Sequence, residues 1–286
     1  MDGHVPAHDL AWGPWLDLSS GDDRRSVSSA AGLYKVRTRG EPDLVYVGQT
    51  SSLRSRMQHL SVSYRDEMPY SDPHTAAPCL WVLRRKRSAE FEFSTCPLDG
   101  GTPIRKAFEC VVISEHRERF GHSPIANFGR MPDGWVKSTG NTAVLAARGN
   151  RRRGYPDASA TRSPDHPCVL DRKNSPVAPR WGGLTWSGWA PLDQAPAVLG
   201  VYRVRQPDET ALVYIGQGAV RARLRSHLAK GKLADHPQWA GFRGSAESSW
   251  FSAAELTFQQ LLEMECDLIA SHVLHVGVAP AVQFLG

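Results

Sequence analysis

"GLYKVRTRGEPDLVYVGQT" (32–50) and "GVYRVRQPDETALVYIGQG" (200–218) are two versions of one stretch within a chain of 286 residues. Each contains Gly-x-Tyr and later Leu-Val-Tyr-x-Gly-Gln, with eleven residues between the two tyrosines. Alternating apolar residues on both sides of a turn-rich segment predict a β-hairpin in each version. A repeat of this length indicates an internal duplication, so we expect two similar structural units in the chain.

The repeat continues on both sides of the hairpins. Upstream, two tryptophans spaced alike occur in 10–18 and in 184–192. Downstream, 108–129 aligns with 264–285 without a gap, and the matched pairs are Glu109/Glu265, Cys110/Cys266, His116/His272, Gly121/Gly277, Pro124/Pro280 and Phe128/Phe284. We therefore predict a first copy at 10–130, a basic linker rich in Gly, Pro and Arg at 131–183, and a second, shorter copy at 184–286.

The remaining pattern predicts the other elements of each copy. Leu53, Met57 and Leu60 recur at helical spacing after serines that can cap a helix. Short apolar runs at 79–83 and 90–96 predict strands, and 103–120 and 254–274 predict one long helix per copy. The expected fold class is α/β (α+β), with two tandem modules, each a small antiparallel sheet of about three strands flanked by helices.

The composition is that of a globular protein with a core, since 41% of residues are hydrophobic and 22% are charged. The start has no basic segment followed by an apolar one, and no apolar run is long enough to span a bilayer. The five cysteines are scattered without a Cys-x-x-Cys pair, so they indicate neither a disulfide framework nor a zinc site. These features predict a cytoplasmic protein.

The positive charge is concentrated in one segment. Residues 130–183 hold ten Lys/Arg against four Asp/Glu, within a chain whose net charge is +5. Such a stretch suggests contacts with a phosphate backbone, and the residues expected to make them are Arg148, Arg151, Arg152 and Arg153. A solvated linker without a partner explains the charge equally well.

Two paired residues indicate chemistry. Glu265 has Leu261, Leu262, Leu268 and Ile269 three or four positions away, so its carboxylate projects from the apolar face of a helix. A buried carboxylate needs a partner or a metal ion, because leaving it unpaired costs several kcal/mol. Glu109 has a similar setting. Core glutamates satisfied by backbone or tyrosine hydroxyl groups are the alternative, whereas Glu115, Glu118 and Glu263 lie on other faces and are expected in solvent.

Arg56 and Arg223 follow their Tyr-x-Gly by a similar interval and lie early in the next helix. The planar guanidinium suits a phosphate because it donates two parallel hydrogen bonds. An exposed helix arginine is the common alternative, as expected for Arg54, Arg221 and Arg225. The tyrosines taken alone are typical of a strand core.

Together these residues resemble the GIY-YIG nuclease superfamily. The first copy has Gly-Leu-Tyr, Tyr-Val-Gly, a downstream arginine, a helix glutamate and an asparagine eighteen residues later, and the second has Gly-Val-Tyr and Tyr-Ile-Gly. The resemblance covers both copies, about three quarters of the chain. It implies a three-stranded antiparallel sheet flanked by helices and hydrolysis of nucleic-acid phosphodiester bonds with one divalent metal ion.

The resemblance assigns roles to residues of both copies. In the first copy the implied catalytic set is Tyr34, Tyr46, Arg56, His59, Glu109 and Asn127, with Tyr34 as general base or water positioner. In the second copy the equivalents are Tyr202, Tyr214, Arg223, His227, Glu265 and Gln283. Glu109 and Glu265 are the implied ligands of Mg²⁺ or Mn²⁺. His59 lies one residue early for the family's histidine, and Gln283 is one methylene longer than the family's asparagine.

The leading hypothesis is a metal-dependent endonuclease acting on DNA, with RNA not excluded. The Asn127/Gln283 difference favours the first copy as the active centre. One alternative is a non-catalytic tandem module that binds nucleic acid, and another is a GIY-YIG fold repurposed for small-molecule chemistry. The paired histidines His116 and His272 are expected to be satisfied in the core or at a helix end, with a metal role as the alternative. The paired tryptophans are expected to pack onto the copies, with base stacking as the alternative.

Overall fold

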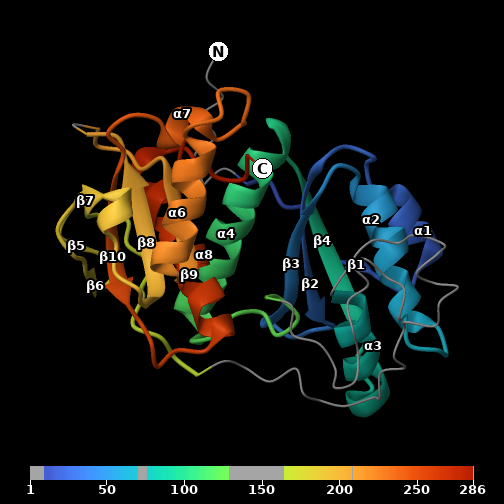
Figure 1. The fold of residues 1–286 in the computed structure, drawn as a ribbon. Coiled ribbons are helices and arrows are strands. Elements are labelled where there is room, and N and C mark those ends of the chain that lie inside the picture. Colours follow the sequence, from blue (N-terminus) through green and yellow to red (C-terminus); the bar gives the residue numbers. More distant parts are fainter. Residues whose placement is uncertain (1–9, 70–75, 129–163, 208, 286) are drawn as a thin grey trace, which may run out of the picture. The chain divides into compact units, whose positions relative to one another are not determined.

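The computed structural model describes residues 10–69, 76–128, 164–207 and 209–285 (Figure 1). They fall into two compact units. Of the described residues, those within 11–99 and 122–128 form the N-terminal unit, and Leu10 with those within 100–121 and 164–285 forms the C-terminal unit. The long helix that ends the first copy is thus grouped with the second copy, and the domain limits drawn from the repeat stay a prediction.

The N-terminal unit has a four-stranded antiparallel sheet in the order β1-β4-β2-β3. Strands β2 and β3 form the predicted hairpin, in which Tyr34 faces Gly48 across the strands. The elements in chain order are β1 (Leu16–Asp17), α1 (Gly21–Ser26), β2 (Gly32–Thr38), β3 (Leu44–Thr50), α2 (Leu53–Leu60), the 3₁₀ helix η2 (Ser61–Tyr64), α3 (Ala76–Arg87) and β4 (Phe91–Pro97).

The C-terminal unit has a four-stranded antiparallel sheet in the order β7-β10-β8-β9 and a separate two-stranded one. Its hairpin places Tyr202 opposite Gly216. The elements in chain order are α4 (Gly101–Phe120), β5 (Arg180–Trp181), β6 (Leu184–Thr185), β7 (Ala190–Pro191), the 3₁₀ helix η3 (Leu192–Gln194), β8 (Leu199–Arg205), β9 (Tyr214–Ala219), α6 (Val220–Lys230), α7 (Trp239–Phe242), β10 (Glu247–Ser252) and α8 (Phe258–Val276).

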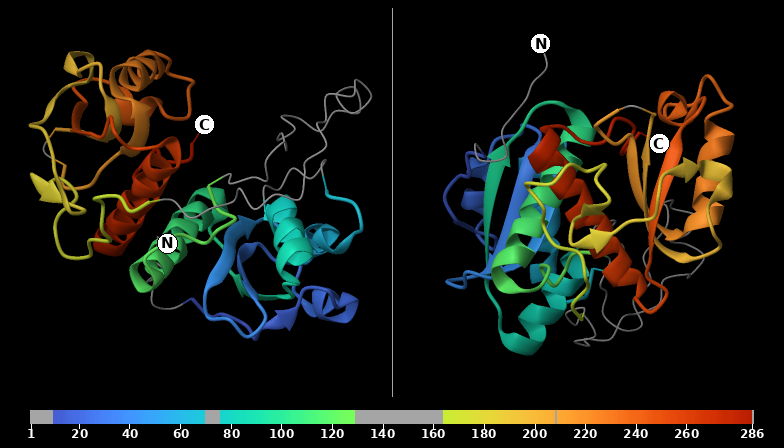
Figure 2. Two further views of the ribbon diagram at one scale, coloured as in Figure 1. Left: turned by 90° about the horizontal axis from the view of Figure 1, so that it is seen from below. Right: turned by 90° about the vertical axis from the view of Figure 1, so that its left-hand side faces the viewer.

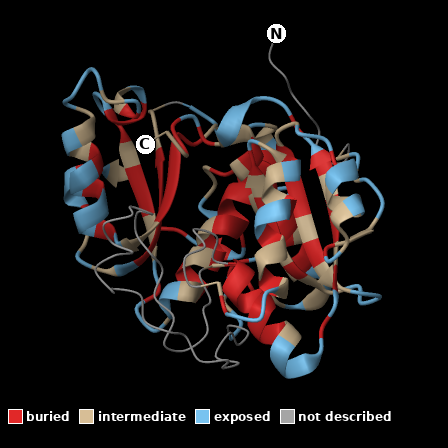
Figure 3. Ribbon diagram, turned by 90° about the vertical axis from the view of Figure 1, so that its right-hand side faces the viewer, coloured by how far each residue is buried: buried red, intermediate tan, exposed pale blue. Residues whose placement is uncertain are grey.

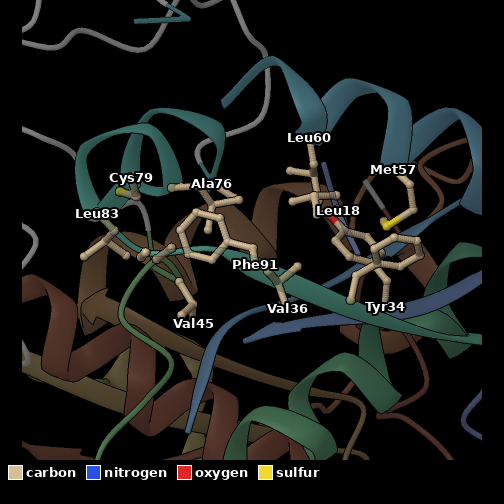
Figure 4. Packing of buried hydrophobic residues seen from close by; sticks show 14 of the residues in the cluster. Leu18, Tyr34, Val36, Val45, Met57, Leu60, Ala76, Cys79, Leu83 and Phe91 are labelled. Carbon is tan, nitrogen blue, oxygen red and sulfur yellow. The ribbon is translucent and has the colours of Figure 1, made fainter. Parts of the chain in front are cut away.

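In the N-terminal unit, one face of the sheet packs against α2 and α3. Strand residues alternate between faces, and Tyr34 and Val36 point into this core. Figure 4 shows Tyr34 beside Met57 of α2 at one end of the cluster, while Leu83 of α3 lies toward the other end. A motif tyrosine is therefore part of the core, as β-strand aromatics usually are.

The C-terminal unit buries both faces of its sheet. Tyr202 and Val204 share a core with residues of α6 and α7, whereas Val201 and Ile215 face α8. Helices α4 and α8 lie side by side in this unit (Figure 2). The strands and inner helix faces are buried, and the outer faces of the helices are exposed (Figure 3).

A buried ionic cluster joins α4 to α8. Arg117 lies 3.0 Å from Asp267 and 3.3 Å from Glu263, and Ser114 donates a 2.6 Å hydrogen bond to Asp267. The expectation that Glu263 is solvated is wrong, because it is 1% exposed. Such a cluster is costly to break, since removing one member leaves an uncompensated buried charge.

The paired tryptophans cover basic residues of the middle strands. Each ring lies against a lysine or arginine of β2 or β8, at a distance typical of cation–π contacts. The pairs are Trp12 with Lys35 (4.2 Å), Trp15 with Arg37 (4.0 Å), Trp186 with Arg203 (4.4 Å) and Trp189 with Arg205 (4.3 Å). These contacts agree with tryptophans that pack onto their own copies.

The sequence predicted most elements, with two exceptions. The hairpins, the strand near 90–96 and the long helices are confirmed, with helix limits shifted by a few residues. The strand predicted at 79–83 is wrong, because this run lies within α3 and is buried there. A short apolar run cannot be told from a buried helix by periodicity. Each large sheet also has a fourth, two-residue strand at its edge.

Among the helices of the described residues, none combines the length and apolar character needed to cross a bilayer.

Candidate active site

Both copies place the first motif tyrosine over the motif glycine. A Cβ atom at Gly48 would overlap the hydroxyl of Tyr34, and one at Gly216 would overlap the hydroxyl of Tyr202. The glycine of Tyr-x-Gly is therefore required by packing, because any larger residue would displace the tyrosine. The two tyrosine rings of a copy are neighbours, with centroids 5.8 Å apart in the first copy and 6.2 Å apart in the second.

In the second copy a histidine completes the tyrosine pair. His227 of α6 is 2% exposed, and its Nε2 shares a 2.8 Å hydrogen bond with the hydroxyl of Tyr202. The imidazole also stacks on Phe242 of α7, with centroids 4.2 Å apart. Burial, followed by the charges of Lys230 and Arg223, lowers the pKa of His227 to about 3. The lowered pKa favours a neutral imidazole at pH 7, which shares this hydrogen bond with the tyrosine hydroxyl without becoming protonated.

Arg223 connects the tyrosines to the surface. Burial raises the pKa of Tyr202 and of Tyr214, while the positive charge of Arg223 opposes that rise. The pKa of Arg223 is raised in turn, chiefly by Tyr202. The arginine side chain is exposed, whereas Tyr202 is fully buried. Arg223 is thus a solvent-accessible cation that interacts with the hydroxyl groups of Tyr202 and Tyr214.

Glu265 of α8 supplies a negative charge to the same site. It is half-buried, and its neighbours Leu261, Leu268 and Ile269 are buried, as the sequence predicted. Loss of solvation raises the pKa of Glu265 to about 7, against the lowering effect of Arg223. Within the described residues it forms no hydrogen bond or salt bridge. A carboxylate in such a position favours a cation as its partner.

The first copy has the tyrosines and the arginine but a different residue at the histidine position. Arg56 lies 5.8 Å from the ring of Tyr34. His59, predicted as the family's histidine, is exposed on α2. The next residue, Leu60, is fully buried.

Helix starts reveal the correct correspondence of the two copies. The amides of Leu53 and Val220, the first residues of α2 and α6, donate to Ala30 O and Val198 O respectively. Counting from these residues, Arg56 matches Arg223, while Leu60 rather than His59 matches His227. The sequence signal was available, because the second copy has one residue fewer between Tyr-x-Gly and its arginine.

Glu109 lies on α4, half-buried, in the C-terminal unit. Tyr34, Tyr46, Arg56 and Asn127 belong to the N-terminal unit. All six predicted residues of the second copy, by contrast, lie within one compact unit.

Asn127 and Gln283 have the same structural task. Val47 N donates to Asn127 Oδ1 (3.0 Å), and Asn127 Nδ2 donates to Val47 O (2.8 Å). Ile215 N donates to Gln283 Oε1 (2.9 Å), and Gln283 Nε2 donates to Ile215 O (3.1 Å). Each amide thus closes the outer edge of the strand that carries the second tyrosine. The extra methylene does not displace the amide, so the argument against the second copy does not hold.

Two further pairs have structural roles. His272 accepts from Leu212 N (3.1 Å) at Nε2 and lies 2.9 Å from Val278 O at Nδ1, and burial lowers its pKa to about 4. It is a satisfied core histidine, as expected. The side chains of Arg54 and Arg221 donate to Val27 O and Ala195 O. Both residues are exposed, as expected, and each guanidinium also anchors its helix to a backbone oxygen.

The predicted phosphate contacts Arg148, Arg151, Arg152 and Arg153, with most of the linker, lie outside the described residues. Comparison of the chain with models of protein families, with curated proteins and with solved structures gives no match in any of the three.

Proposed function

We propose that the chain is a metal-dependent endonuclease of the GIY-YIG type that hydrolyses DNA phosphodiester bonds. It would consist of two tandem modules, and the second copy would carry the main active centre. The observation that carries this proposal is the arrangement of Arg223, the tyrosine pair and Glu265 within one unit. An exposed guanidinium near a carboxylate that forms no hydrogen bond or salt bridge with the described residues suits a phosphodiester held together with a divalent cation.

The order and register of the sheets support the two-module proposal. Both large sheets have a two-residue edge strand, then the third long strand, then the hairpin. The same residue pairs face each other across the hairpins, and the same amide contact closes each outer edge. The parallel arrangement is what duplication of one module would produce.

Glu265 fits the role of metal ligand. Mg²⁺ binds few carboxylates and keeps several waters, so one half-buried glutamate is an adequate protein ligand. When bound, such an ion stabilises negative charge on the phosphoryl oxygens. Mn²⁺ has similar ligand preferences. Glu109 would be the corresponding ligand of the first copy.

The chain's own residues would bind and orient the substrate. Arg223 would hold a phosphoryl oxygen and share the charge that develops on it. Tyr202 and Tyr214 would fix the guanidinium, and His227 would hold the hydroxyl of Tyr202. The raised pKa of buried Tyr202 makes it a poor base, so the structure favours positioning over proton abstraction.

Cleavage of supercoiled plasmid tests the proposal. The wild-type chain should nick the plasmid in Mg²⁺ and not in EDTA, and Glu265→Gln should reduce the rate by orders of magnitude. A mobility shift of DNA without cleavage in Mg²⁺ or Mn²⁺ would instead support the non-catalytic binding module. A matched RNA substrate establishes which nucleic acid is cut.

A further inference from the structure

Helix α6 and the turn after it carry positive charge without compensation. Residues 210–234 contain five basic residues and no Asp or Glu, and these are Arg221, Arg223, Arg225, Lys230 and Lys232. Arg221 is used to hold Ala195 O, and Arg223 belongs to the site. The others have no role in the function proposed above.

Lys230 lies on the same side of α6 as Arg223. Seven residues are nearly two turns, so the two side chains are about 10 Å apart along the helix axis. Lys230 Nζ donates to Gln238 Oε1 at 2.6 Å. Burial and then the charge of Arg223 lower the pKa of Lys230. Asp235, the nearest acid along the chain, forms no salt bridge with it in the described part of the structure.

The turn after α6 packs on the end of α7. The backbone at Gly231 packs directly on Phe242 and Arg243, since a Cβ atom there would overlap them. Arg243 is exposed, and its guanidinium stacks over the ring of Trp239 at 4.5 Å. A stacked guanidinium keeps its donors free for an anion while its position is fixed.

We propose that Arg223, Lys230 and Arg243 form a track for the phosphate backbone of the DNA strand that enters the active site. The spacing of about 10 Å between Arg223 and Lys230 spans about three nucleotide steps of one strand, at about 3.4 Å per step along the duplex axis. This inference rests on the proposed function and adds the surface by which the substrate is held.

The track is tested by binding rather than by cleavage. Affinity for a short DNA duplex is measured by fluorescence anisotropy at several salt concentrations, in EDTA and in the Glu265→Gln background. Lys230→Gln with Arg243→Gln should weaken binding about tenfold to a hundredfold and reduce the slope of log K against log salt by about two, because two phosphate contacts are lost. Lys230→Arg with native Arg243 should retain the parent affinity and slope.

Arg225→Gln is the matched control, because Arg225 is an exposed cation on another side of the same helix. For each charge removed, Arg225→Gln should change the affinity and the salt slope much less than the track variants do. Equal losses per charge in the control and in the track variants would mean a diffuse positive field and would overturn the inference. Unchanged binding in the track variants would also overturn the inference. It would leave the proposed nuclease function standing, because plasmid cleavage tests that function separately. Weakened binding in a chain that never cuts DNA would keep the track and refute the nuclease.

Discussion

The two sequence copies repeat three structural contacts and differ in the residue at a buried position beside the first tyrosine. Each has a glycine beneath its first tyrosine, an arginine that anchors the helix, and an amide that closes the sheet edge. The eighth helix residue is Leu60 in the first copy and His227 in the second. Both copies thus keep the residues that the fold needs, whereas a polar residue at the eighth helix position occurs in the second copy only.

The first test converts the second copy into the first at that position. His227→Leu should reduce DNA cleavage by about tenfold to a hundredfold, because Tyr202 and Arg223 lose their fixed position. The protein should still fold, with its free energy of unfolding lowered by about 1–3 kcal/mol, because the buried Tyr202 hydroxyl loses its 2.8 Å hydrogen bond to His227. Plasmid cleavage rates and thermal unfolding measure the two effects.

His59→Leu is the control for this change, because His59 is exposed on α2. It should leave cleavage unchanged. A His227→Leu protein that cuts at the wild-type rate would show that the difference between the copies has no functional meaning.

A second test asks whether the amides are equivalent. Asn127→Ala and Gln283→Ala each leave the N–H and C=O of one buried strand residue unpaired. Each should lower the free energy of unfolding by about 2–4 kcal/mol. Urea denaturation measures this. A large loss for Asn127→Ala beside a negligible one for Gln283→Ala would restore the distinction that the sequence suggested.

The third test uses pH to examine Glu265. Its pKa is about 7 in the folded chain against 4.5 ordinarily, so ionisation is harder in the folded state. The contribution of Glu265 to wild-type stability should therefore fall as pH rises through the window from about 4.5 to 7. At pH 8 without divalent ions, Glu265→Gln should be more stable than wild type by about 1–3 kcal/mol, and at pH 4 nearly equal.

Mg²⁺ should remove this difference by stabilising the wild type above pH 7 and not the variant. Glu255→Gln, at an exposed position, is the control and should show neither effect. Equal pH dependence in Glu265→Gln and wild type would contradict the assigned environment of this carboxyl.

The repeated tyrosines and glycines predicted the hairpins, because strand alternation and turn residues are local properties of the sequence. The run at 79–83 was assigned to a strand because burial on all sides produces the same apolar pattern in a helix. His59 was assigned to the site as the histidine nearest the family's position, although it lies one residue early, and counting from the helix starts places Leu60 there instead. The Gln283 substitution was judged by side-chain length alone, whereas the reach of an amide also depends on where its backbone lies.

The most direct measurement compares Glu109→Gln and Glu265→Gln in the same plasmid assay with Mg²⁺. Both changes keep the shape of the side chain and remove the charge, and the two residues are equivalent in the repeat. Supercoiled, nicked and linear forms are followed over time. The second copy as active centre predicts that Glu265→Gln loses cleavage by orders of magnitude while Glu109→Gln retains most of it. Loss in Glu109→Gln with normal cutting by Glu265→Gln would contradict this account and place the active centre in the first copy.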